Sequence, residues 1–115
     1  MIFENPTFHE GLNITVRRGA KQYLNETEFG NYAYGKGDAD EPIGFVFVEY
    51  QWQIRFVDIE NEDIEKEHDP NCRNIDALYE TMLKFYPDFD AREIVTLVAF
   101  RFKPFSDAFT FSNLS

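Results

Sequence analysis

The hydrophobic pattern along the chain changes between a period of two and a period of three to four. The first period of two lies within residues 11–19, where Ile14 and Val16 alternate with polar side chains. In a strand, this alternation sends the apolar pair to one face and the intervening residues to the other. Thr15 and Arg17 are therefore predicted to point into one shared space.

Two further strands are predicted from runs of aromatic and β-branched residues. Residues 43–52 contain Phe-Val-Phe-Val between turn-like residues, which favours a strand in the centre of the sheet. The β character continues through 54–57, either as a paired strand or as an extension past a bulge at 51–53. Residues 93–102 are too apolar for an exposed face and are predicted to close the domain.

The period of three to four follows Asn74, whose side chain is a good N-cap. It predicts a helix that continues through Tyr86 and is ended by Pro87. Before it, residues 58–69 hold a run of Glu and Asp that predicts a short polar helix with a solvated face.

Residues 21–41 are rich in Gly, Asn, Asp and Tyr, a composition typical of a long loop. Such a loop in a small domain is often functional, and a tyrosine such as Tyr32 could stack on a flat ligand. An ordinary surface loop has the same composition, so both interpretations stay open. Residues 1–10 predict either a helical turn or an edge strand.

The length of the chain predicts one domain over 1–115, with its core at about 8–102 and a tail at 103–115. The formal net charge of −10 repels a long polyphosphate, so any contact with nucleic acid should be local and short. The acidic surface could itself be the binding surface, because surface carboxylates can imitate a phosphate backbone and occupy a protein that binds nucleic acid.

No apolar run is long enough to span a membrane, and no signal segment begins the sequence. The single cysteine, Cys72, cannot form an internal disulfide. We therefore expect a cytoplasmic protein without a membrane partner.

Common catalytic and metal-binding motifs are missing from the sequence. Glu67, His68, Asp69 and Cys72 are close in sequence, but adjacent residues on a helix point in different directions, so no metal site is expected. There is no Gly-x-Ser-x-Gly elbow and no phosphate-binding loop. No cofactor is predicted.

The remaining polar residues suit a small polar ligand. Thr15, Arg17 and Arg18 come from one predicted strand, and the acidic segment contributes Glu65 or Glu67. A base could stack on a tyrosine of the 21–41 loop while these groups bound its edge. An edge strand with solvated arginines shows the same spacing, so this site is a hypothesis.

The order of these elements resembles the ASCH domains, which are similar to PUA domains. The resemblance covers residues 8–102 and is carried best by Thr15-Val16-Arg17 and by Tyr86-Pro87 before the last strand. It implies an α+β fold, a small PUA-like β-barrel of about five or six strands with one long helix and one or two short ones. It also implies a cleft that binds RNA or a modified nucleoside.

Among these domains, the chain is similar to small bacterial amidohydrolases that remove the acetyl group from N-acetylated cytidine. A lysine, a threonine and a glutamate carry that reaction, and the threonine matches Thr15. The glutamate corresponds to Glu67 or, alternatively, to Glu65. Leu12 occupies the lysine position and cannot accept a proton, which leaves Lys21 as an amine that could reach back.

Three functions follow from the sequence. The first, favoured because the expected lysine is absent, is recognition of a short RNA or a modified nucleoside. Its binding residues would be Thr15, Arg17, Arg18 and Tyr32. The second is an amidohydrolase with Thr15 and Glu67 as catalytic residues. The third is an acidic protein that binds a basic partner protein.

Overall fold

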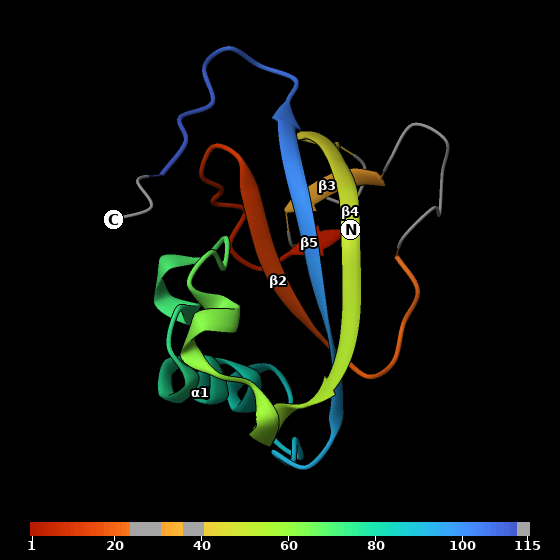
Figure 1. Cartoon of the computed structure of the whole chain (residues 1–115). Helices are drawn as coiled ribbons and strands as arrows, with labels where there is room; N and C mark the ends of the chain where they lie inside the picture. The colour runs from red at the N-terminus through yellow and green to blue at the C-terminus, as the bar shows by residue number, and fades with distance from the viewer. Residues whose placement is uncertain (24–30, 36–40, 113–115) are drawn as a thin grey trace.

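One mixed sheet of five strands forms the centre of this computed structural model, which describes residues 1–23, 31–35 and 41–112 (Figure 1). In sheet order the strands are β1 (Ile2–Phe3), β3 (Asn31–Gly35), β4 (Gly44–Arg55), β5 (Ile94–Pro104) and β2 (Leu12–Arg18). β1 pairs with β3 in parallel, and all other neighbours are antiparallel. The α+β class is confirmed. The described strands do not close into the predicted barrel, because β1 and β2 form the two edges of an open sheet.

Helix α1 (Ile75–Phe85) is the predicted long helix. It begins where expected, because the Asn74 side chain accepts a hydrogen bond from the Ala77 N–H at 2.9 Å. Leu78 and Met82 are buried on the face that packs against the sheet. Shorter 3₁₀ helices are η1 (Phe56–Asp58), η2 (Asn61–Ile64) and η3 (Pro70–Cys72).

β5 lies between two hydrophobic clusters on opposite faces of the sheet. Its residues alternate, so Val95 and Leu97 join the cluster that contains Met82 of α1, whereas Phe100 and Phe102 join the other cluster. The second cluster is largely aromatic and draws on both ends of the described chain, through Phe3, Phe8, Phe109 and Phe111. The two clusters hold the N-terminal residues and α1 on opposite sides of the sheet.

The predicted loop over 21–41 is wrong at 31–35, where β3 pairs with β4 and β1. Ala33 is fully buried there opposite Gly44, so side-chain burial outweighs the turn-like composition. Residues 24–30 and 36–40 of that loop lie outside the described residues.

β4 is central, as predicted, and continues through its bulge rather than ending at it. The bulge lies between Val48 and Tyr50, slightly before the predicted position at 51–53.

The acidic segment is not the single polar helix that the sequence predicts. After η2 the chain extends beside β2, where the Ile14 N–H donates to the Lys66 carbonyl and the His68 N–H donates to the Ile14 carbonyl, both at 2.8 Å. A continued helix would leave this edge of β2 without backbone partners. The pairing places Glu67 directly beside the strand that carries Thr15.

Gly11 and Gly19 bracket β2 with positive φ angles of 83° and 85°. Glycine adopts this left-handed conformation without the steric cost that a Cβ brings. The chain therefore bends at a glycine at each end of β2.

Candidate functional site

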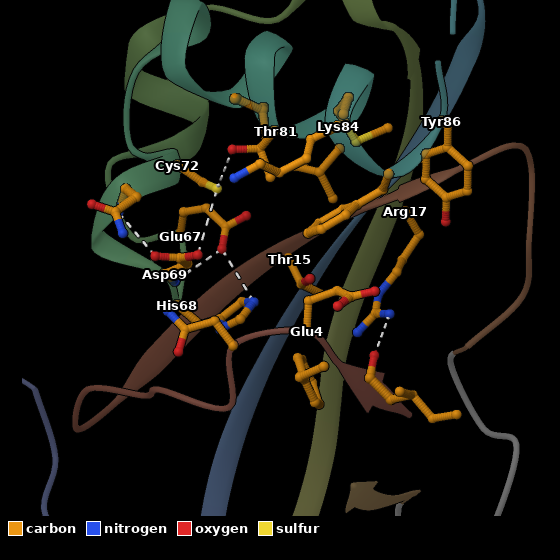
Figure 2. A pocket seen from close by; sticks show the side chains of 18 residues that line it. Glu4, Thr15, Arg17, Glu67, His68, Asp69, Cys72, Thr81, Lys84 and Tyr86 are labelled. Carbon is orange, nitrogen blue, oxygen red and sulfur yellow. Dashed lines mark hydrogen bonds and ion pairs between the residues drawn. The ribbon is translucent and has the colours of Figure 1, made fainter. Parts of the chain in front are cut away.

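A cavity of about 640 Å³ lies along β2, with α1 on one side and the N-terminal residues on the other (Figure 2). The chain from 67 to 72 forms a third wall. Of the residues predicted from sequence, the cavity brings together Thr15, Arg17 and Glu67. Its other polar lining residues include Glu4, Asn5, His68, Asp69, Asn71, Thr81, Lys84 and Tyr86.

Thr15 is nearly completely buried in the middle of this site. It pairs with Val98 of β5, which fixes its backbone, and its side chain points to the face opposite Ile14. Its side chain lines the cavity, and a hydroxyl at this position can donate or accept a hydrogen bond.

Arg17 lies two residues further along β2 and reaches toward the N-terminal residues (Figure 2). Its Nη1 donates to the Ile2 carbonyl at 2.6 Å, and its guanidinium carbon lies 4.8 Å from the centre of the Phe3 ring. Its Nε and Nη2 are buried and have no hydrogen-bond partner among the described residues. Burial lowers the pKa of Arg17, although a guanidinium stays charged at physiological pH.

Glu67, only 3% exposed, accepts a hydrogen bond from the Asp69 N–H at 3.0 Å. Burial raises the pKa of its carboxyl to about 8, an effect larger than the lowering by that hydrogen bond and by Arg17. At pH 7 the carboxyl is therefore mostly protonated and presents both a donor and an acceptor. Glu65 is exposed and lines a separate cavity, so Glu67 is the glutamate of this site.

His68 lies beside Glu67, and its Nε2 is 3.3 Å from the Glu67 Oε1. Burial lowers the pKa of His68 to about 4, so the ring is neutral at pH 7. The Nδ1 is 2.9 Å from the Thr7 carbonyl, which can only accept, so Nδ1 carries the proton. Nε2 then offers its lone pair toward the Glu67 carboxyl, and the two side chains form a neutral pair rather than an ion pair.

Lys84 is one of several polar lining residues that were not predicted from the sequence. Figure 2 shows its side chain extending from α1 along the helix side of the cavity. A signal was present, because Leu78, Thr81 and Lys84 follow one another at steps of three and so lie on one face of the helix. The wall of the cavity therefore contains an amine in addition to Thr15 and Glu67.

Arg18, predicted to bind the ligand, does not line the cavity. Its Nε donates to Glu93 at 3.0 Å and its Nη2 to Asp88 at 3.1 Å. These two carboxylates raise the pKa of Arg18, and its guanidinium lies over the Tyr86 ring. The alternation along β2 sends Arg18 to the opposite face from Arg17.

Tyr32, the predicted stacking residue, is 48% exposed and is also not among the lining residues. It contacts Phe45 and Phe105 on the sheet, with ring centroids 5.2 and 6.1 Å away. Tyr86, at the end of α1, is the tyrosine that does line the cavity.

Neither residue considered for the lysine role belongs to this cavity. Leu12 packs against the α1 side of the core and lines the separate, smaller cavity of about 340 Å³. The backbone of Lys21 bonds to Thr96 and Gln51, and its exposed side chain is not part of the lining.

Comparison with known proteins gives no match to a family model, to a curated protein or to a solved structure. Within the part of the chain that the structure describes, no helix is long and apolar enough to span a membrane. The same residues contain no group of three or more His, Cys, Asp or Glu side chains arranged to hold a metal ion.

Proposed function

We propose that this domain binds a nucleoside, free or at the end of a short RNA, in the cavity beside β2. The observation that carries the proposal is the pair of buried donors on Arg17, Nε and Nη2, which have no partner among the described residues. A buried donor left unpaired costs about 1 to 3 kcal/mol, so an acceptor supplied by a ligand would be stabilised there.

A ligand reaches these donors past the N-terminal residues, which form one wall of the cavity. β1 contributes two paired residues, Ile2 and Phe3, to its contact with β3. Such a short pairing opens at a lower free energy than the core strands do. A small displacement of β1 would expose the Arg17 donors to the cavity.

The other polar groups also suit a nucleoside. Glu67, protonated at pH 7, offers a donor and an acceptor, as the edge of a base requires. The Thr15 hydroxyl can form a hydrogen bond with either a donor or an acceptor of the base. The volume of about 640 Å³ falls within the usual range for small-molecule sites.

The proposed ligand is short because the chain has a net charge of −10, which opposes every phosphate outside the cavity. The resemblance to ASCH domains implies the same class of ligand. Tyr86 replaces Tyr32 as the candidate stacking residue, since it lines the cavity. Arg18 acts in this proposal only by supporting Tyr86 from the other side.

An NMR titration of ¹⁵N-labelled protein with cytidine, uridine, N-acetylcytidine and a short single-stranded RNA tests this function. We expect shifts centred on Thr15, Arg17 and Glu67. Arg17→Ala should weaken binding about tenfold or more while the spectrum stays folded. Arg101→Ala is the matched control, because Arg101 pairs with Glu49 outside the cavity.

Equal affinity for the Arg17→Ala protein, or no shifts with any of these ligands, would overturn the proposal. The third function predicted from sequence, binding of a basic protein through the acidic surface, would then be the one to pursue.

A second candidate function is hydrolysis of an N-acylated nucleoside, favoured by the presence of Lys84 in the same cavity as Thr15 and Glu67. The Thr15 hydroxyl would attack the acyl carbon and give its proton to one oxygen of the Glu67 carboxyl, as the other oxygen gives its proton to the leaving nitrogen, while the Lys84 amino group would donate a hydrogen bond to the acyl oxygen. Water would then attack the acyl group held on Thr15, which releases the acid and returns a proton to the Thr15 oxygen. The net change is amide plus water to carboxylic acid plus amine.

Acetate production from N-acetylcytidine, followed by ¹H NMR, tests this candidate. Lys84→Met should abolish acetate release, whereas Lys66→Met, an exposed lysine outside this cavity, should leave it unchanged. Binding of N-acetylcytidine without acetate release would exclude the amidohydrolase and retain the binding function.

A further inference from the structure

The backbone of β2 is paired on one side by β5 and is only partly covered on the other. Ile14 directs its N–H and C=O away from β5, since both groups bond to the 66–68 segment. In an antiparallel pair, successive residues direct their backbone groups alternately toward and away from the partner strand. Thr15 therefore bonds to β5, and Val16, two residues after Ile14, directs its N–H and C=O to the same open side as Ile14.

The covering segment leaves this edge before it reaches Val16. The bridge to β2 is isolated at Ile14 and Glu67, and the chain then turns into η3 (Pro70–Cys72). Val16 lines the cavity at this point. No hydrogen bond from a described residue meets the Val16 N–H or C=O on the open side. One backbone donor and one backbone acceptor therefore border the cavity between Glu67 and Arg17.

We infer that the Val16 N–H and C=O bind the Watson–Crick edge of the base, so that the cavity selects bases with an adjacent, unsubstituted N–H donor and acceptor. This inference rests on the proposed nucleoside binding. Uracil meets the requirement through N3–H and a neighbouring carbonyl oxygen, and base edges are bound in this manner when single bases are recognised. The Val16 N–H donates to a carbonyl oxygen of the uracil, and the uracil N3–H donates to the Val16 carbonyl oxygen.

The same edge is poorly suited to an added peptide strand. Strand addition needs free backbone groups at several alternate residues of the edge strand. Among the residues of β2 that line the cavity, only Val16 directs its backbone groups to the open side, and Arg18, the next residue to do so, does not line the cavity. A single donor and acceptor pair, enclosed by α1 and the N-terminal residues, fits a planar ring better than an extended chain.

Amide hydrogen exchange tests the free edge directly, in the absence and presence of saturating uridine. In the free protein, the Val16 amide should exchange faster than those of Thr15 and Arg17, because only the latter two bond to β5. Uridine should slow exchange at Val16 and leave the other two nearly unchanged. A Val16 amide that is protected before ligand is added, or one that stays fast when uridine is bound, would overturn the inference.

Methylated uridines separate this inference from the proposed function. 3-Methyluridine lacks the N3–H and should bind about tenfold or more weakly than uridine. 5-Methyluridine, which carries its methyl group away from that edge, should keep its affinity. If 3-methyluridine binds as well as uridine and both still require Arg17, the nucleoside site stands and the Val16 inference falls. If neither nucleoside binds, the proposed function itself fails.

Discussion

The Nε2 of His68 lies 3.3 Å from the Oε1 of Glu67, and burial makes both side chains neutral near pH 7. The pKa of His68 falls to about 4 and that of Glu67 rises to about 8, in each case because burial disfavours the charged form. Between these two pH values, the wall of the cavity presents a protonated acid beside a neutral imidazole. Because of this arrangement, the stability of the domain should depend on pH.

Ionisation of Glu67 should destabilise the protein at alkaline pH. A carboxyl with a pKa of about 8 when folded and an ordinary value when unfolded contributes stability that is fully present below pH 4.5 and lost as the pH rises through 8. The loss should reach about 3 to 5 kcal/mol. Glu67→Gln cannot ionise, so it should be more stable than the wild type at pH 9 and similar to it at pH 4.5.

Urea unfolding of both proteins at the two pH values measures this difference. Glu65→Gln is the control, because Glu65 is exposed and its substitution should not change the pH dependence. A stability difference between Glu67→Gln and the wild type that is the same at pH 4.5 and pH 9 would rule out the raised pKa.

Arg17 and Arg18 are adjacent in sequence and should respond oppositely to substitution by methionine. Arg17→Met removes two buried donors that have no partner together with the Nη1 bond to the Ile2 carbonyl, and these two effects oppose each other, so the stability of the free protein should change little, while nucleoside affinity falls about tenfold or more. Arg18→Met removes the ion pairs to Asp88 and Glu93 and should lower stability while affinity is retained. Thermal unfolding and NMR titration measure the two effects. A loss of affinity in Arg18→Met without one in Arg17→Met would reverse the assignment of these residues.

The face on which each β2 side chain lies was predictable from alternation alone. A period of two places Thr15 and Arg17 together, and the structure lines one cavity with both. The same rule excludes Arg18 from that face, although its charge had suggested a role in binding. The Arg18 partners, Asp88 and Glu93, are about 70 residues away in sequence, so no local pattern reveals them.

Long-range pairing also explains what the sequence did not reveal about the acidic segment and β3. Local charge favours a solvated helix at 58–69, but the unpaired edge at Ile14 binds the backbone of residues 66 and 68. Likewise, the composition of 31–35 is that of a turn, and burial of Ala33 within the sheet overrides it. In both places, a tertiary contact outweighs the local preference.

The Asn74 cap should contribute measurably to the position of α1 and hence to the cavity wall. Removing a side-chain cap costs about 0.5 to 2 kcal/mol, so Asn74→Ala should lower the free energy of unfolding by that amount. Glu80→Ala, at an exposed position of the same helix, should have an effect within about 0.5 kcal/mol of zero. Urea denaturation distinguishes the two variants. Equal effects would mean that the cap does not hold the start of the helix.

Cys72 should resist thiol reagents in the folded protein, although it lines the cavity. Burial raises the pKa of its thiol to about 12, and the single thiol proton has two alternative acceptors, the Thr81 Oγ1 at 3.6 Å and the Asp69 Oδ2 at 3.8 Å from the Sγ. Only the thiolate reacts, so at pH 8 labelling by a disulfide reagent should be about three orders of magnitude slower than for an exposed cysteine. The rate should increase sharply across the urea unfolding transition. Rapid labelling without denaturant would show instead that the cavity stabilises a reactive thiolate, and Cys72 would then have to be considered part of its chemistry.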